Sequence, residues 1–222
     1  MLEPLINGPT VSYVAFISTA LFAILTALVV AQQTAVIDRE LILSLRESAS
    51  PLLTALLLAV TFTSGRLAVP AVILFAAALY RRSGFRTAGY YVGACVSAQL
   101  LNAILKHSVD RARPHNLSPR LTAAGGLSYP SADVMLAVVI FGLGALLLST
   151  TIRAPRVRLA AVSSSALFVI AAAVARVYLG AHWPTDVLGG ALAGLACAAI
   201  CIVALRRPPA VTVPVSLAAQ EG

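Results

Sequence analysis

The chain has 222 residues, of which 59% are hydrophobic and 11% are charged, whereas roughly 25% of the residues of an average soluble domain are charged. This composition excludes an ordinary soluble fold and favours membrane-spanning helices, each of which needs about 20 mostly apolar residues. The net charge of +8 comes from basic residues in short breaks between apolar runs, a pattern that indicates lipid headgroups and membrane topology rather than nucleic acid.

Six apolar runs are predicted to cross the membrane. The first has no preceding Lys or Arg and exceeds the core of a secretory signal, so we expect a retained helix, although residues 29–31 resemble a cleavage site. Three cysteines, Cys95, Cys197 and Cys201, lie within the runs without metal-ligand spacing, and we interpret them as small core hydrophobes. The predicted spans are residues 9–32, 66–82, 87–107, 132–151, 157–178 and 184–206.

A segment of mixed character, about residues 36–65, separates the first two spans. It begins with charges and ends in an apolar run, 52–63, that is too short to span comfortably, so we expect interfacial helices there, with a seventh span as the alternative. The predicted fold is all-α: a polytopic membrane protein with a six-transmembrane-helix bundle and an interfacial helical segment after the first span. We expect one domain over residues 1–207, with its core at 66–206, and a disordered tail at 208–222.

Basic residues in short loops indicate the topology, because cytoplasmic loops carry an excess of Lys and Arg. With six spans, three basic clusters fall on one face, which we expect to be cytoplasmic together with both termini. These clusters are Arg81, Arg82 and Arg86; Arg153, Arg156 and Arg158; and Arg206 with Arg207. The opposite face also carries cations, against this bias, and they need another explanation. They are Lys106, Arg111, Arg113, Arg120 and Arg176.

Three polar blocks, residues 106–114, 129–133 and 176–186, lie at the outer ends of spans. Ionisable residues in such places are functional candidates. Lys106, Arg113 and Arg176 can converge at one end of the bundle, where the planar fork of arginine suits phosphate oxygens and lysine adds a point charge. These three cations therefore predict a clamp for an oxyanion.

The second and third blocks add groups that suit phosphate chemistry. Ser131 begins a span, so its hydroxyl and the following backbone amides, beginning with Ala132, can point at the same anion with the helix dipole behind them. His182 and Asp186 are four residues apart, so the carboxylate can hold one ring nitrogen as N–H and leave the other free to attack phosphorus. A phosphohistidine intermediate would follow.

Each of these features also has a simpler structural explanation. Arg and Lys at span ends often reach toward headgroups, a histidine beside Trp183 and Tyr178 fits an aromatic interfacial belt, and a serine at a span start is most often a helix cap. These explanations weaken jointly, because they do not account for three polar blocks on one face. Gly190, Gly194 and Ala198 form a small-residue stripe that we interpret as helix packing alone.

The three blocks also carry a family resemblance. Lys-x6-Arg-Pro covers residues 106–114, Pro-Ser opens the fourth span at 130–131, and Arg-x5-His-x3-Asp covers residues 176–186. This ordered pattern resembles the type 2 phosphatidic acid phosphatase superfamily, which also includes bacterial acid phosphatases and vanadium haloperoxidases. The resemblance covers about residues 66–206, and the leading helix and amphipathic segment look like the membrane-bound bacterial branch.

The resemblance implies roles for individual residues. His182 corresponds to the nucleophile and Asp186 to its partner, and no metal or other cofactor is required. Membrane members of the family remove phosphate from phosphatidate, phosphatidylglycerol phosphate or polyprenyl diphosphate at the outer leaflet. The residues that match the family's phosphoryl-oxygen ligands are Lys106, Arg113, Ser131 and Arg176.

One position departs from the family pattern. The second motif of the family is Pro-Ser-Gly-His, but Ala132 and Asp133 stand here in place of Gly and His. The missing histidine protonates the leaving group, and an aspartate is ionised at neutral pH, a form that nearby cations favour further. A diphosphate lipid releases a weak base that needs little protonation. His107 and His115 flank the first motif, but neither matches a family position as a replacement acid.

These observations predict a metal-independent phosphatase that acts on phosphorylated membrane lipids at the extracytoplasmic face of a bacterial plasma membrane. The aspartate at position 133 predicts a preference for polyprenyl or other lipid diphosphates. Alternatively, Asp133 is expected to serve as a base for phosphohistidine breakdown. The implied partners are the lipid substrate and the bilayer, with no nucleic acid. Two alternatives stay open: a lipid phosphotransferase using the same site, and a non-catalytic phospholipid-binding or transport protein with an impaired site.

Overall fold

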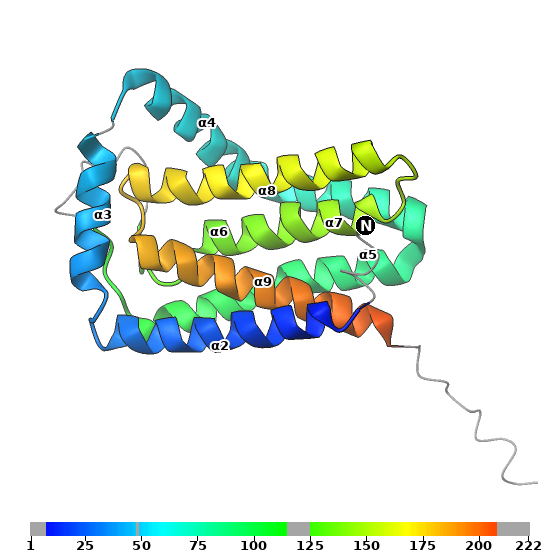
Figure 1. The fold of residues 1–222 in the computed structure, drawn as a ribbon, viewed down its shortest axis with the longest axis horizontal. Coiled ribbons are helices and arrows are strands. Elements are labelled where there is room, and N and C mark those ends of the chain that lie inside the picture. The colour runs from blue at the N-terminus through cyan, green and yellow to red at the C-terminus, as the bar shows by residue number, and fades with distance from the viewer. Residues whose placement is uncertain (1–7, 48, 115–124, 208–222) are drawn as a thin grey trace, which may run out of the picture.

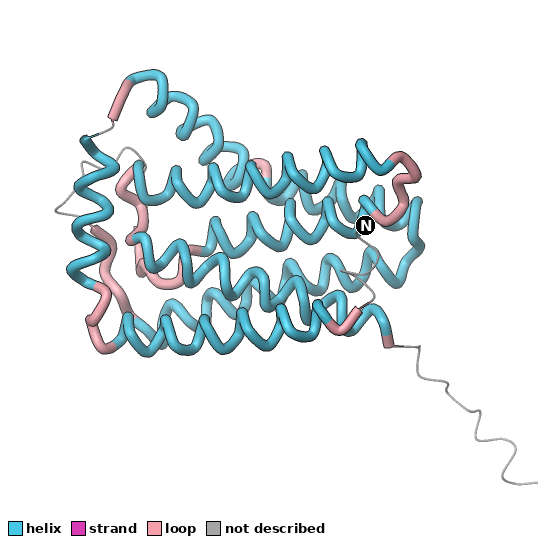
Figure 2. Tube along the Cα trace, in the orientation of Figure 1, coloured by secondary structure: helices cyan, strands magenta, loops and turns pink. Residues whose placement is uncertain are grey.

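The computed structural model describes residues 8–47, 49–114 and 125–207. Their regular secondary structure is entirely helical, joined by loops and with no strand, as Figure 2 shows, which confirms the predicted all-α class. The predicted disordered tail at 208–222 lies outside the described residues, as do Arg120 and His115.

Five helices in the described part of the chain are long and apolar enough to cross a membrane. One of them, Ala132–Ser149, consists of α6 (Ala132–Ala137), the π-helical turn η1 (Val138–Leu143) and α7 (Gly144–Ser149). The other four are α2 (Thr10–Val30), α5 (Ala68–Val109), α8 (Pro155–Tyr178) and α9 (Pro184–Arg206).

The helix α5 makes two passes rather than one. Its 42 residues would form a straight rod of about 63 Å, about twice the thickness of the hydrocarbon core of a bilayer. Gly84 interrupts the helix with φ +85° and ψ 174°, a conformation open almost only to glycine. The chain doubles back there (Figure 1), so α5 supplies two of the six spans that the sequence predicts.

Two shorter helices form the segment between the first two spans. α3 (Ala35–Glu47) lies across one end of the bundle, and α4 (Pro51–Arg66) runs obliquely to the spans (Figure 1) and packs against α8. The side chain of Ser50 accepts the N–H of Leu53 at 3.3 Å and caps the start of α4. With 16 residues, α4 is shorter than the range typical of a spanning helix, which agrees with an interfacial segment rather than a seventh span.

The predicted basic clusters gather at the end of the bundle opposite α3. The turn at Gly84, the α7–α8 connection and the end of α9 all lie there (Figure 1). Arg206 donates to the carbonyl of Gly8 at 2.9 Å, and Arg86 donates to the carbonyl of Arg207. The three polar blocks of the sequence lie at the other end, beside α3.

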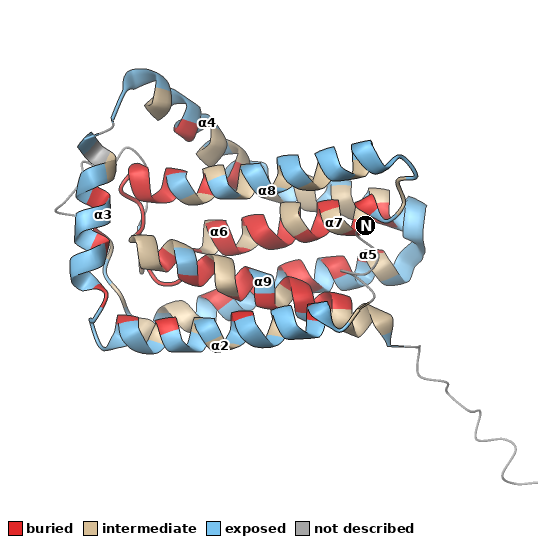
Figure 3. Cartoon of the chain, in the orientation of Figure 1, coloured by how far each residue is buried: buried red, intermediate tan, exposed pale blue. Residues whose placement is uncertain are grey.

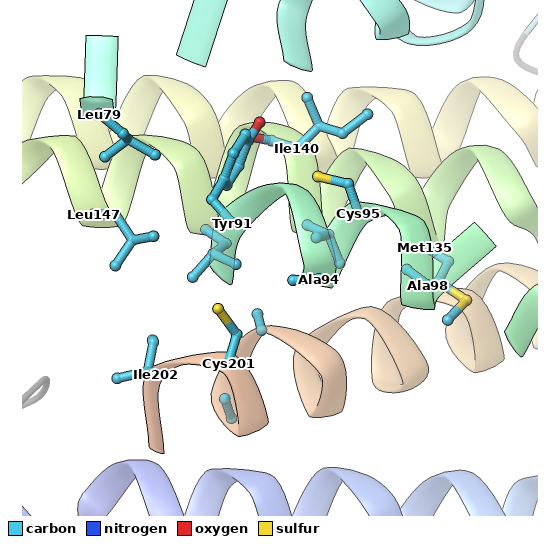
Figure 4. Packing of buried hydrophobic residues seen from close by; sticks show 14 of the residues in the cluster. Leu79, Tyr91, Ala94, Cys95, Ala98, Met135, Ile140, Leu147, Cys201 and Ile202 are labelled. Carbon is cyan, nitrogen blue, oxygen red and sulfur yellow. The ribbon is translucent and has the colours of Figure 1, made fainter. Parts of the chain in front are cut away.

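The core lies between the second half of α5, the α6–α7 segment and α9. Figure 3 shows burial concentrated on α6, on α9 and on the turn between α8 and α9, with exposed outer faces on α2, α4 and α8. In Figure 4 the Tyr91 ring points toward Ile140, whose carbonyl accepts its hydroxyl proton at 3.1 Å. Cys95 and Cys201 are buried in this cluster, and Cys197 packs against it, as expected of small core hydrophobes.

Small residues of α9 let it approach α6 closely. A Cβ atom at Gly190 would lie 2.5 Å from the carbonyl oxygen of Ser131, and one at Gly194 would lie 2.8 Å from that of Met135. Both obstacles are backbone atoms, which a side-chain rotation cannot move. The small-residue stripe is therefore helix packing, and it also determines how near Ser131 lies to the start of α9.

We predict that Gly190→Ala will lower the free energy of unfolding by about 1–3 kcal/mol, because the added methyl group must push α6 and α9 apart. Thermal unfolding in detergent measures the effect. Gly93→Ala is the matched control, since a Cβ atom at Gly93 of α5 meets nothing within 4 Å. Equal melting temperatures for the two variants would contradict the close approach of α6 and α9.

Candidate active site

His182 is positioned by a tight turn at the end of α8. Gly180 has a φ of +69°, which favours glycine, and the chain turns back so that two N–H groups reach the last turn of α8. Those of Ala181 and His182 both donate to the carbonyl of Arg176, at 3.0 and 3.1 Å. Pro184 then begins α9, a position that suits proline. As a result, His182 is 1% exposed and faces into the end of the bundle.

Asp186 lies in the first turn of α9 and faces the His182 ring. Its Oδ2 atom is 3.5 Å from Nδ1 of His182, longer than an ordinary hydrogen bond, and Nδ1 has no hydrogen-bond partner among the described residues. The same oxygen accepts the backbone N–H of Trp183 at 2.9 Å and the hydroxyl proton of Ser128. These donors, together with the start of the helix, stabilise an ionised carboxylate, and Asp186 is fully buried among them.

The other ring nitrogen of His182 faces Arg113. Nη1 of Arg113 is 3.1 Å from Nε2 of His182 and donates to the carbonyl of Ala181 at 2.6 Å. Because a guanidinium group can only donate, Nε2 must be the unprotonated nitrogen, and the ring proton must be on Nδ1, toward Asp186. The contacts thus favour the tautomer with its proton on Nδ1, in which the lone pair of Nε2 faces the cations.

The surroundings of His182 favour its neutral form. Burial lowers the pKa of His182 below its ordinary value, the interaction with the Asp186 carboxylate raises it, and the charges of Arg113 and Lys106 lower it again. The net direction is downward, so the imidazole is neutral at pH 7.

Lys106 and Ser131 lie around the same space. The Lys106 ammonium donates to the carbonyl of Leu127 at 2.7 Å and is near enough to Arg113, Asp186 and Asp133 to interact with their charges. The Ser131 N–H donates to the carbonyl of Asp186 at 2.9 Å, which ties the start of α6 to α9. Its hydroxyl is buried and has no hydrogen-bond partner among the described residues. Such a group requires an explanation, and an anion would satisfy it.

The third predicted cation, Arg176, pairs with Asp133. Nη2 of Arg176 lies 3.0 Å from Oδ1 of Asp133 and 3.5 Å from Oγ of Ser64. The Asp133 side chain, which follows Ala132 in the first turn of α6, is 31% exposed, whereas Arg176 is buried. Asp133 thus neutralises one cation of the predicted clamp in this structure.

Sequence reasoning assigned no role to four polar residues beside the His–Asp pair. Arg111 had been noted only as a cation on this face, and Asp38 only as a charge of the interfacial segment. The signal for Arg111 was its place in the block of Lys106 and Arg113, but no local pattern connects Asp38 to that block. The four residues are Asp38, Arg111, Ser128 and Thr185. His107, which was considered as a replacement acid, is exposed at the end of α5.

The apolar helical bundle defines an integral membrane protein, and a buried His–Asp pair and several cations meet at one end of it. The PAP2 superfamily model matches residues 87–208, more than half of the chain, and the chain belongs to this superfamily. The family resemblance stated from the sequence motifs is therefore confirmed. No curated protein sequence matched the chain.

Two solved structures share the fold. A transmembrane PAP2-type phosphatidylglycerolphosphate phosphatase from Bacillus subtilis is 21% identical, with a TM-score of 0.78 over 85% of this chain and 94% of that chain. LpxE from Aquifex aeolicus is 24% identical, with a TM-score of 0.60 over 74% of this chain and 93% of that chain. At these identities the likeness establishes the membrane PAP2 fold.

Proposed function

We propose that this protein is a metal-independent phosphatase that removes phosphate from phosphorylated membrane lipids through a phosphohistidine at His182. The observation that carries the proposal is the placement of the buried imidazole, whose Nε2 lies 3.1 Å from the Arg113 guanidinium and whose Nδ1 faces Asp186. A nucleophilic imidazole needs this combination of an orienting carboxylate and an open lone pair. The family of the chain, and the phosphatase activity named for its Bacillus subtilis neighbour, support the same reaction class.

The phosphoryl oxygens would be bound by Lys106, Arg113, Arg176, Ser131 and the backbone amide of Ala132. In the structure, Arg113 donates to Nε2 of His182, the nitrogen that would attack. When a phosphate enters, Arg113 would donate to a phosphate oxygen instead and leave Nε2 free. The buried Ser131 hydroxyl would then donate to another oxygen of the same phosphate. Donors fixed before the substrate arrives stabilise the charge of the transition state without a cost of reorganisation.

The chemistry would proceed in two displacements at phosphorus. In the first, the lone pair of Nε2 forms an N–P bond as the P–O bond to the lipid breaks, and the leaving oxygen keeps the bonding electrons. The imidazole then carries a positive charge, which Asp186 stabilises across Nδ1. In the second, water attacks the phosphohistidine, releases inorganic phosphate and restores the neutral ring.

Asp133 would bias the choice of leaving group. An alkoxide leaving a phosphate monoester needs a proton as it departs, whereas a phosphate leaving a diphosphate is a far weaker base. An aspartate is ionised at neutral pH and is a poor proton donor, and Asp133 lies against the Arg176 guanidinium rather than a proton source. The substrates favoured by this site are therefore polyprenyl or other lipid diphosphates, and Asp133 can act as a base toward water in the second displacement.

The position of the site suits a substrate whose chains stay in the bilayer. The turn between α8 and α9, which carries the His–Asp pair, lies at the end of the spans beside α3, and the α7–α8 connection and the end of α9 lie at the other end (Figure 1). Cytoplasmic loops carry the excess of Lys and Arg, so we assign the site to the extracytoplasmic face and both termini to the cytoplasm.

A phosphate-release panel with the parent protein and Asp133→His tests the diphosphate preference. The parent is expected to cleave a polyprenyl diphosphate faster than phosphatidate. Asp133→His should raise the phosphatidate rate at least about tenfold, because general acid catalysis contributes about 10²–10⁴, and should change the diphosphate rate little. Asp133→Asn is the matched control, since it breaks the pair with Arg176 without supplying an acid. Equal parental rates on both substrates would contradict the preference.

The same panel separates the alternative functions. A phosphotransferase would yield a phosphorylated alcohol when glycerol or another acceptor alcohol is added, with less inorganic phosphate. A non-catalytic binder would release no phosphate from any lipid in the panel, even as Asp133→His. Phosphate release by the parent that is lost in His182→Ala supports the phosphatase.

A further inference from the structure

Asp38 is a buried carboxylate on a helix whose neighbouring apolar residues are exposed. On α3, Asp38 is 0% exposed, whereas the adjacent Ile37 is 57% exposed. Ile42, one turn further along, is buried on the same face. A carboxylate is costly to bury unless it is paired and hydrogen-bonded, so the inward face of α3 must bring Asp38 to specific partners.

Those partners lie at the start of α9. Oδ1 of Asp38 accepts the backbone N–H of Thr185 at 2.9 Å, and Oδ2 accepts the Thr185 hydroxyl proton at 2.7 Å. The first N–H groups of a helix lack partners within it, so Asp38 caps α9 from a different helix. Thr185 immediately precedes Asp186, and this cap therefore fixes the turn from which the Asp186 side chain projects.

Arg111 connects the two buried carboxylates. Its Nη2 atom donates to Oδ2 of Asp38 at 2.6 Å, and its Nη1 atom donates to Oδ1 of Asp186 at 2.7 Å. Nη1 also lies 2.8 Å from the Thr185 hydroxyl oxygen, and the guanidinium carbon lies 5.4 Å from the centre of the Trp183 ring. Arginine, with its planar fork, is the residue that can hold two carboxylates in one geometry.

We infer that Asp38 and Arg111 are positioning residues of the proposed phosphatase: they set the orientation of Asp186 and the share of its charge that reaches His182. The interfacial helix α3 thereby becomes part of the catalytic apparatus, although it is not a span and Asp38 does not touch the imidazole. This inference rests on the proposed function, and it adds a charge chain from Asp38 through Arg111 and Asp186 to His182.

Each charge in the series from Asp38 through Arg111 and Asp186 has a definite effect on the protonation of His182. Asp38 offsets the charge of Arg111, so that Asp186 keeps most of its attraction for a protonated imidazole. Loss of the negative charge of Asp38 would disfavour the protonated ring, and loss of the positive charge of Arg111 would favour it. Other charged groups face His182 from α5, from the segment after α5, and from α6, α8 and α9. Those that act on the ring are Lys106, Arg113 and Asp186; the pair of Asp133 and Arg176 is joined to them through the charge of Lys106, and all five residues are unchanged in the variants below.

The test compares Asp38→Asn and Arg111→Gln by the pH dependence of kcat/KM for phosphate release. Because the nucleophile must be neutral, the rate falls as pH drops through the pKa of His182. Asp38→Asn should move this low-pH limb to lower pH, and Arg111→Gln should move it to higher pH, each by about half a unit or more. Both variants should also lower kcat about tenfold or more, as loss of a group that orients a catalytic ligand does.

Controls separate this effect from a general loss of structure. Glu40→Gln removes an exposed carboxylate of the same helix and should leave the limb in place. Asp38→Glu keeps the charge but shifts the carboxylate, so it should lower kcat without moving the limb. In Asp38→Asn/Arg111→Gln the two charge changes oppose each other, and the limb should return toward that of the parent. Thermal unfolding in detergent shows which variants are folded.

Shifts in the same direction for the two single variants, or no shift in either folded variant, would overturn the inference. A second readout does not depend on activity: the NMR titration of the His182 ring, assigned by its absence in His182→Gln, should show the same opposite shifts. If the parent releases no phosphate from any lipid, the proposed function fails, whereas the ring titration still decides whether Asp38 and Arg111 act on His182.

Discussion

His182→Gln is expected to abolish phosphate release, with kcat reduced by a factor on the order of 10⁴ or more, because the displacement loses its nucleophile. Glutamine is near in volume to histidine, so the buried position stays filled and the protein should remain folded. The decrease should appear in kcat for every lipid in the panel, since all substrates pass through the same intermediate. Acid-labile phosphate should be trapped on the parent protein and not on the variant.

The matched control is His107→Gln, which removes an exposed imidazole at the end of α5. It should keep the parental rate, and it also tests whether His107 supplies a proton to the leaving group. A His182→Gln variant that is folded and retains more than about a tenth of the parental rate would contradict a phosphohistidine mechanism, because a lost nucleophile costs far more.

Arg176→Ala should produce the second-largest loss, about 10²–10³ in kcat/KM, the scale of removing one fixed donor to transition-state charge. Two effects combine: a cation of the clamp disappears, and Asp133 is left without its partner 3.0 Å away. An uncompensated carboxylate beside the phosphate would repel the substrate. Adding Asp133→Asn to Arg176→Ala should therefore recover part of the loss, which steady-state kinetics on one lipid substrate can measure.

The control for Arg176 is Arg39→Ala, which removes an exposed arginine from α3 at the same end of the bundle and should change kcat/KM little. If Arg176→Ala and the double variant with Asp133→Asn are equally impaired, the charge of Asp133 does not act on the substrate. Activity of folded Arg176→Ala equal to that of the parent would remove Arg176 from the clamp.

The spans were predictable because the bilayer requires long apolar runs and charged residues mark their ends. The observed helices begin and end within a few residues of the predicted spans, and the break at Gly84 falls among the arginines that separate the second span from the third. The spacing of His182 and Asp186 was also informative, because the turn before α9 lets the carboxylate reach back toward the imidazole, and the structure has them 3.5 Å apart.

Contacts between distant segments were not predictable in the same way. Asp38 and Arg111 are 73 positions apart in the chain, and no periodicity of α3 indicates which residue of α9 it would cap. The pairing of Asp133 with Arg176 was also missed, although each residue had been noted by itself. Such contacts depend on how the helices pack and on how the buried charges pair. Neither can be derived directly from a single sequence.

The turn at Gly84 also determines on which membrane surface each later segment of the chain lies. Without it, α5 would be a rigid rod about 63 Å long, and its final turn, with Lys106, would project about 30 Å out of the bilayer. Every later crossing would then change direction, and Ser131 would begin its helix on the opposite membrane surface. One residue with a φ of +85° therefore decides on which membrane surface Lys106, Ser131 and His182 assemble, and whether they share that surface with Asp38 of α3.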